Sequence, residues 1–206
     1  VFHVYPRFQV KDQDKVILAK TMEILRLSPE EAMDTQGHRL SVTGVRVAGK
    51  SARHEFDPNL DTIMIVPLVR PVAPGQSVVA EVDFVVDLPD FWGRWGHHNG
   101  VTYLLNWYPI LAHHDGRGWE RTPFVPWHQP WHQEAGHYTV RFDLPADQVV
   151  ASSGRITRRD AGGPGRQVVT IVASPARDFA FVCSNRFDAR ERQVGATLVR
   201  VVSFPE

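Results

Sequence analysis

The sequence predicts an all-β protein, built as a sandwich or saddle of antiparallel sheets with very little helix. Two observations support this fold class: apolar and polar residues alternate along several segments, and turn-forming residues separate these segments. Such alternation is typical of strands with one face in the core and the other in water. The 206 residues suffice for a core without disulfides, and we expect one domain over residues 1–206.

The clearest predicted strands lie within residues 76–88 and 137–145. In the first, Val82 and Phe84 fall on one face and Asp83 falls on the other. The second alternates in the same way. Both end at a Leu-Pro step, where proline lacks the backbone donor that a central strand needs.

Several shorter segments also predict strands, and clusters of glycine, proline and asparagine separate them. The glycine-rich segment 162–165 predicts the tip of a hairpin. The shorter strand segments are Leu40–Val47, Thr62–Val69, Val101–Trp107, Gln148–Ser152, Gln167–Val172, Asp178–Ser184 and Thr197–Phe204.

Helix is expected in one short stretch that begins near Ser28. This serine is a good N-cap residue, Pro29 suits the first helical position, and a glutamate follows at the third. Gly37 then limits the helix to about two turns. Residues Val16–Leu27 fit a helical stripe as well as a strand, so their structure stays open at this point.

Charge and cysteine content exclude several classes of protein. The formal net charge is zero, with 23 basic and 23 acidic side chains, so nothing attracts the chain to nucleic acid or to an anionic membrane. Cys183 is the only cysteine; it cannot form an internal disulfide, and we expect a small core residue. No segment has the roughly eighteen consecutive apolar residues that a membrane span needs. Because the first residue is Val1 and not methionine, no targeting signal can be read there, and localisation stays unknown.

Histidine and tryptophan are concentrated between Phe91 and His137, which holds all six tryptophans. His128 and His132 have the spacing that places two imidazoles on one helical face. Pro130 lies between them, however, and would cost such a helix about 3 kcal/mol. The glutamate of a His-Glu-x-x-His motif is also missing. We therefore expect loop histidines and no metal site.

We expect the tryptophans to pack within a long loop as a satellite core. The alternative is an exposed aromatic platform that stacks on sugar rings or peptides. Neither a nucleophile elbow nor a phosphate-binding loop occurs, so the sequence assigns no catalytic residue.

Several short motifs occur in an order that resembles a known family. The motifs are Phe-His-Val-Tyr-Pro-Arg at 2–7, Asn-Trp-Tyr-Pro at 106–109, the strand at 138–145, Val-Ala-Ser-Ser-Gly at 150–154 and Arg-Asp-Phe-Ala at 177–180. In this order the sequence resembles the N-terminal β domain of bacterial zinc aminopeptidases of the M1 (gluzincin) family.

The resemblance implies that the chain starts inside that domain, after its first strands, and ends near the junction with a thermolysin-like catalytic domain. The family's zinc ligands, catalytic glutamate and amine-binding Gly-x-Met-x-Asn loop belong to that missing domain. The resemblance therefore implies no catalytic residue, metal or cofactor within residues 1–206, and zinc in the catalytic domain. The implied partners are this catalytic domain, in the same polypeptide, and a peptide substrate of the parent enzyme.

In the family, a loop ahead of the strand that corresponds to Tyr138–Leu144 lends a glutamine or glutamate near the free amino group of the substrate. An amide or carboxylate oxygen suits this role because it accepts hydrogen bonds from an ammonium group. The resemblance thus points to Gln129, with Glu134 as a second candidate. The segment 127–130 departs from the usual Pro-Cys-x-Asp-x-Pro motif of the family. Packing of the loop is therefore the alternative to a substrate-facing role.

The leading hypothesis is a non-catalytic accessory domain that packs on, and partly caps, the active site of a parent aminopeptidase. One alternative is a stand-alone tryptophan-rich module that binds carbohydrate or peptide. Another is an independent histidine-based metalloenzyme. The residue specificity and activity of the parent, and the oligomeric state, are left open by the sequence.

Overall fold

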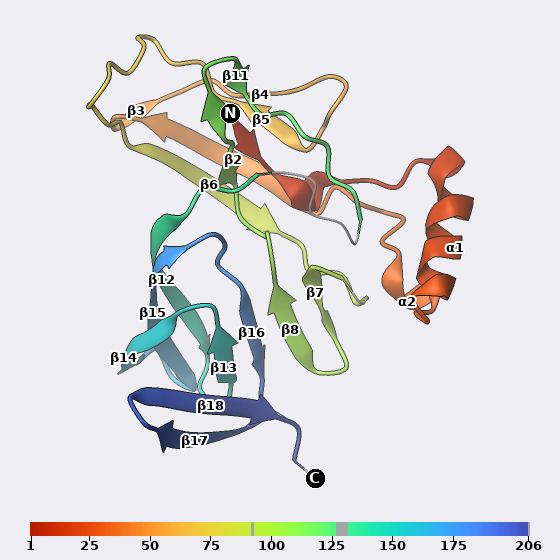
Figure 1. The fold of residues 1–206 in the computed structure, drawn as a ribbon, viewed down its shortest axis with the longest axis vertical. Coiled ribbons are helices and arrows are strands. Elements are labelled where there is room, and N and C mark those ends of the chain that lie inside the picture. Colours follow the sequence, from red (N-terminus) through yellow and green to blue (C-terminus); the bar gives the residue numbers. More distant parts are fainter. Residues whose placement is uncertain (92, 127–131, 206) are drawn as a thin grey trace. The chain divides into compact units, whose positions relative to one another are not determined.

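The computed structural model describes residues 1–91, 93–126 and 132–205 and divides the chain into two compact units. The first unit comprises Val1–Gly93 and Asn106–Gln133, and the second comprises Arg94–Leu105 and Glu134–Glu206. Strands account for 44% of the residues and helices for 10% (Figure 1). These values confirm the all-β class and the scarcity of helix. The expectation of one domain over residues 1–206 stays a prediction.

The described part of the first unit contains two antiparallel sheets and a small hairpin. One sheet has the order β4-β5-β1-β9 and the other the order β3-β2-β6, and the hairpin joins β10 to β11. The bounds are β1 Phe2–His3, β2 Leu40–Val47, β3 Lys50–Ser51, β4 Glu55–Phe56, β5 Ile63–Ile65, β6 Ala80–Val86, β9 Ile110–Leu111, β10 His114–Asp115 and β11 Gly118–Trp119.

The core of the first unit forms where these sheets present their apolar residues to each other. Leu40 and Val45 of β2 pack with Met64 of β5, and Val4 and Val66 complete the buried cluster. Each of these side chains is at most 9% exposed, and complete burial of one such side chain contributes roughly 2 kcal/mol. The apolar residues that alternate along β2 thus face the core, as the sequence predicted.

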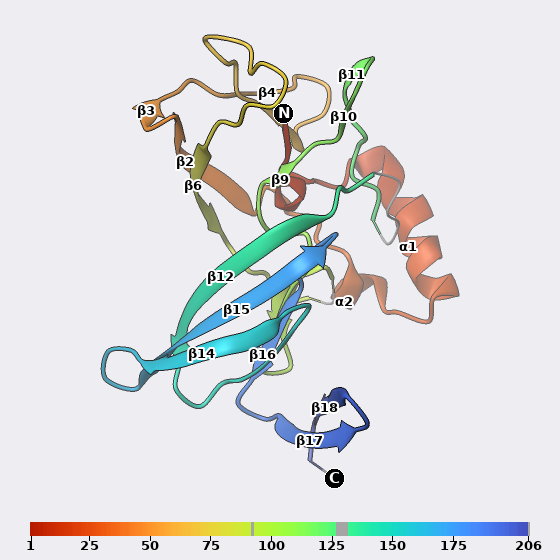
Figure 2. The ribbon, with the colours of Figure 1, turned by 60° about the vertical axis from the view of Figure 1, so that its left-hand side comes forward.

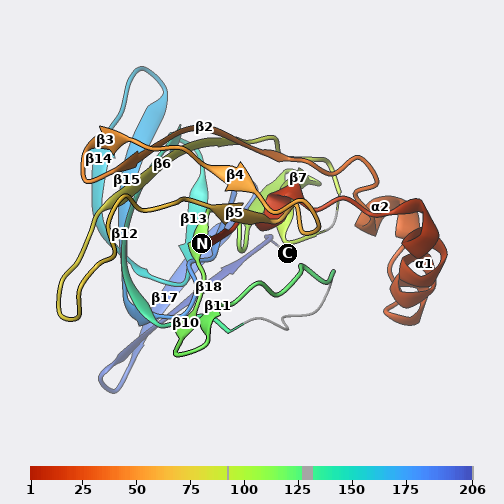
Figure 3. The same cartoon turned by 90° about the horizontal axis from the view of Figure 1, so that it is seen from above.

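The open stretch Val16–Leu27 is helical, since α1 spans Lys15–Ile24. Only Met22 of this helix is buried, whereas Val16 and Ile24 are more than 70% exposed. Two 3-10 turns, Tyr5–Arg7 and Asp12–Asp14, precede α1. The helices lie at the end of the first unit that is opposite β3 (Figures 1 and 3).

The helix predicted after Ser28 begins at Pro29 as expected, but α2 ends at Ala32 after a single turn. Asp34 ends it by accepting hydrogen bonds from the backbone N–H groups of Gln36 and Gly37, both at 3.1 Å. These bonds offer the backbone a turn in place of a helix. The predicted length of about two turns was therefore too long.

Gly37 and Arg39 hold this turn in place. Gly37 has a φ of 63°, and a Cβ atom there would lie 2.5 Å from the carbonyl oxygen of Phe8, so only glycine fits. Arg39 forms a two-pronged ion pair with Asp34 at 2.8 and 3.0 Å. Burial by itself would raise the pKa of the Asp34 carboxyl. The hydrogen bonds from Arg39 and Gly37 outweigh burial and hold that pKa below its usual range.

The second unit contains, in its described part, two antiparallel sheets and a terminal hairpin (Figure 2). The sheet orders are β12-β15-β14 and β13-β16-β8-β7, and β17 pairs with β18. The bounds are β7 Trp95–His98, β8 Val101–Leu104, β12 Gly136–Pro145, β13 Val149–Ser152, β14 Arg155–Ala161, β15 Arg166–Ala176, β16 Phe181–Ser184, β17 Asp188–Val194 and β18 Thr197–Ser203. The glycine-rich segment 162–165 connects β14 to β15, as a hairpin tip should.

The core of the second unit is built on β15 and β16. Val169 and Ile171 of β15 are completely buried, and Phe181 of β16 is 2% exposed. The ring of Phe181 stacks on that of Phe142 with centroids 3.8 Å apart. Cys183 is buried here as a small core residue, and this burial raises the pKa of its thiol.

Candidate functional site

Of the two residues that the family resemblance singles out, only Glu134 lies among the described residues. Gln129 lies outside the described residues, as does the rest of segment 127–130. Glu134 is exposed and lies two residues before the start of β12 in the second unit. Their role near a substrate stays a prediction.

Two histidines meet beside the β10–β11 hairpin of the first unit. The rings of His113 and His132 have centroids 4.6 Å apart at an angle of 62°. His114 packs instead on Trp119, with ring centroids 4.8 Å apart. The neighbours His113 and His114 thus have different partners, which fits the opposite directions expected for adjacent residues in an extended chain.

Glu120 holds the backbone beside this histidine pair. Its carboxylate accepts hydrogen bonds from the N–H of His132 at 3.1 and 3.2 Å and from the hydroxyl of Thr122. Glu120, His113 and His132 line a cavity of about 330 Å³. The sequence did not foresee that His132 would meet His113, because the two residues are distant along the chain.

His113 and His132 of the first unit each offer a ring nitrogen that could bind a metal ion. A zinc site takes at least three protein ligands, so this pair requires a further donor. Glu134, the other side chain with a potential ligand atom, is exposed and belongs to the second unit.

His3 is a buried histidine that the sequence did not single out. It is 1% exposed, its ring stacks on that of Tyr5 with centroids 5.0 Å apart, and neither ring nitrogen has a hydrogen-bond partner among the described residues. Burial lowers the pKa of His3 to about 4, and the nearby Glu120 carboxylate offsets only part of this effect. The ring is therefore neutral at neutral pH.

An apolar cavity in the first unit has a volume of about 930 Å³. Its lining includes Phe2, Val72, Leu111 and Trp119. Trp119 is 41% exposed, so this tryptophan does not follow the expected burial in a satellite core. Trp95 is 5% exposed, but it lies in strand β7 of the second unit and not in a loop. Trp92, Trp127 and Trp131 lie outside the described residues.

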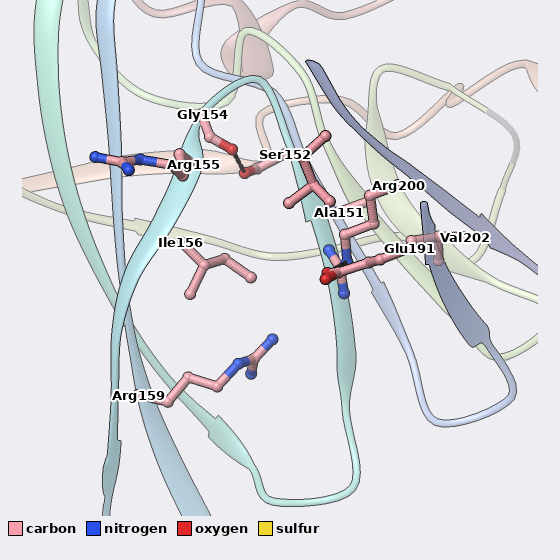
Figure 4. Close-up of a pocket in the computed structure, with 10 residues that line it drawn as sticks. Ala151, Ser152, Gly154, Arg155, Ile156, Arg159, Glu191, Arg200 and Val202 are labelled. Carbon is pink, nitrogen blue, oxygen red and sulfur yellow. Dashed lines mark hydrogen bonds and ion pairs between the residues drawn. The ribbon is translucent and has the colours of Figure 1, made fainter. Parts of the chain in front are cut away.

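A cavity of about 620 Å³ in the second unit combines charged and apolar side chains (Figure 4). Arg159 extends into it toward Glu191 and Arg200, whereas the guanidinium of Arg155 points away from them. Arg200 forms an ion pair with Glu191 at 3.1 Å and donates a hydrogen bond to the carbonyl oxygen of Val150. For this region the sequence predicted only the hairpin tip at residues 162–165.

Comparison with known proteins gives matches among solved structures. The M1 zinc metallopeptidase of Deinococcus radiodurans is 21% identical with a TM-score of 0.52, over 79% of this chain and 37% of that chain. A mutant from the same organism bound to a Tyr-Ser-Ala substrate, and a two-domain M1 mutant bound to L-arginine, are each 20% identical with a TM-score of 0.53 and the same coverage. The chain has the fold of one part of an M1 zinc metallopeptidase.

This M1 fold confirms the resemblance found in the sequence motifs. The chain spans 37% of the length of the M1 structures that it matches. No protein-family model matches the sequence, and no curated protein matches it either. Among the described residues, no helix is long and apolar enough to cross a membrane.

Proposed function

We propose that this chain is the non-catalytic N-terminal accessory domain of a zinc aminopeptidase of the M1 family, where it packs on and partly caps the peptidase active site. The observation that carries this proposal is the M1 fold, shared with 37% of the length of the matched enzymes. The sequence also lacks a His-Glu-x-x-His motif in all 206 residues. In the parent, zinc bound by the catalytic domain of the same polypeptide would polarise the peptide carbonyl and activate water.

Exposed apolar side chains support a role as a docked domain. In the first unit, Leu68, Val69 and Val79 are 43%, 100% and 68% exposed. In the second unit, Val201 of β18 is 56% exposed. Apolar side chains that are exposed in an isolated domain can be covered when a partner domain docks.

An activity assay tests this division of labour. The purified 206-residue chain, supplied with zinc, is expected to show no hydrolysis of aminoacyl p-nitroanilides. The full-length parent is expected to hydrolyse them and to lose activity with a chelator. Chelator-sensitive hydrolysis by the 206-residue chain would contradict the proposal. Saturable quenching of the intrinsic tryptophan fluorescence by a sugar or a free peptide would instead support the stand-alone binding module.

Within this function, Gln129 and Glu134 are proposed to face the substrate. An amide or carboxylate oxygen there would accept a hydrogen bond from the free amino group of the peptide. In the parent, Gln129→Ala or Glu134→Ala is expected to raise KM about tenfold, because a hydrogen bond to a charged group contributes roughly 1.5–3 kcal/mol. Gln148→Ala, in the turn ahead of β13, is a matched control and should leave KM unchanged. If Gln129→Ala and Glu134→Ala keep the same KM as the Gln148→Ala control, neither residue lies in the substrate site.

A further inference from the structure

A β-bulge places Arg159, whose side chain is exposed, on the face of the edge strand β14 that it shares with the buried residues of β15. Ile156 pairs with Ile171 of β15, but the next pairs are Arg158 with Thr170 and Arg159 with Val169. Thr157 is therefore an extra residue in β14. Since directly paired residues lie on one face of a sheet, Arg159 shares the face of Ile156 and of the buried residues of β15.

The guanidinium of Arg159 is held from one side only. Its Nη1 donates a hydrogen bond to Oε1 of Gln167 at 2.8 Å. The amide nitrogen of Gln167 donates to the carbonyl oxygens of Pro145, Ala146 and Gln148, which orients this side chain as the acceptor. Among the described residues Gln167 is the hydrogen-bond partner of Arg159, so further guanidinium donors stay available to the cavity.

The rest of the cavity wall limits which ligand could meet these donors. Ile156, Leu198 and Val202 supply apolar surface, and the Arg200–Glu191 ion pair lies across from Arg159 (Figure 4). Because Arg155 points away and Arg200 is paired with Glu191, Arg159 is the lining guanidinium that faces a ligand, which favours an anion. The carboxylate of Glu191 disfavours a second negative charge on that ligand. The volume of about 620 Å³ falls in the range of small-molecule sites.

We propose that this cavity binds a small monocarboxylate that bears a short apolar chain. The carboxylate would accept hydrogen bonds from Arg159, in the paired geometry that a guanidinium provides, and the chain would pack on Ile156, Leu198 and Val202. The site lies wholly within the second unit. It therefore does not depend on the proposed peptidase role of the parent.

Protection of a sheet edge is the competing role for Arg159. A bulge and an inward-pointing charge on an edge strand both discourage pairing with another chain. This role predicts that loss of the charge promotes association of copies, and it predicts no ligand. The two roles therefore give different experimental results.

The test is an NMR titration of the 206-residue chain with N-acetyl-leucine, followed at the backbone amides of Ser152, Ile156 and Leu198. We expect saturable shifts with N-acetyl-leucine and none with N-acetyl-leucinamide, which lacks the charge, or with inorganic phosphate. Arg159→Gln should weaken binding at least about tenfold, because a charge-assisted pair is lost. Arg158→Gln is the matched control, since Arg158 pairs with Asp160 at 2.7 Å on the opposite face.

Arg159→Lys provides a second variant, which keeps the charge and removes the fork of donors. Arg159→Lys should bind N-acetyl-leucine more weakly than the native chain does. This comparison tests the same contact if Arg159→Gln does not fold. The proposal would be overturned by any of three results. These are shifts that do not saturate, equal shifts with N-acetyl-leucinamide, and equal affinities of the Arg158 and Arg159 variants for N-acetyl-leucine. Dimerisation of Arg159→Gln without any ligand binding by the native chain would establish the edge-protecting role instead.

Discussion

Replacing Phe181 with alanine is expected to lower the free energy of unfolding by about 4 kcal/mol, the usual cost of removing a buried aromatic ring. Phe181 is 2% exposed, and its ring stacks on Phe142 with centroids 3.8 Å apart. The substitution removes this stacking contact and leaves a cavity at the centre of the second unit. Urea denaturation followed by far-UV circular dichroism would measure the change.

Phe204→Ala is the matched control for this experiment, because it deletes the same ring in the same unit. Phe204 is 46% exposed and contacts Phe187 and Arg186. We expect a loss of about 1 kcal/mol, since an exposed ring leaves no enclosed cavity. Equal losses for the two variants would show that Phe181 does not lie in the core described above.

Lowering the pH from 6.5 to 4 is expected to cost the fold about 3 kcal/mol through His3 alone. The pKa of His3 is about 4 in the folded chain and 6.5 in a solvated reference state. Between these values the unfolded chain binds a proton that the folded chain does not, so the free energy of unfolding falls as the pH falls. Below about pH 4 both states are protonated and this contribution stops changing.

Denaturation series at several pH values, on the native chain and on His3→Phe, would measure this effect. The phenylalanine variant keeps an aromatic ring beside Tyr5 and cannot take up a proton. Its stability should therefore lose about 3 kcal/mol less between pH 6.5 and 4. His114→Phe removes an exposed histidine of the same unit and should retain the native pH dependence. An unchanged pH dependence in His3→Phe would show that His3 is not buried as a neutral ring.

Strands with one buried face could be predicted from the sequence. Leu40–Val47 forms β2 with the predicted bounds, and the strand predicted at 137–145 is one residue longer at its start. The strands predicted at Val101–Trp107 and Thr62–Val69 were both too long, because neighbouring residues end β8 and β5 earlier. Asn106 has a φ of 53° and turns the chain after β8, while Pro67 follows β5 and lacks a backbone donor.

The strands β14 and β17, which lack fully buried residues, could not be found from alternation. All residues of β17 are exposed, and β14 has a charged sequence with a bulge, so neither shows an apolar period of two. Backbone pairing with β18 and β15 defines them instead. The same limit applies to the sites. The contact between His113 and His132 depends on the path of the chain, and the direction of Arg159 depends on the bulge.

The rate at which the Cys183 thiol is modified can report local opening of the second unit. A thiol reacts with alkylating reagents as the solvated thiolate, and here the side chain is 7% exposed with a raised pKa. Covalent modification therefore has to wait until β16 separates from β8 or β13. Since the chain has no other cysteine, the rate of that single reaction would report how often this strand opens.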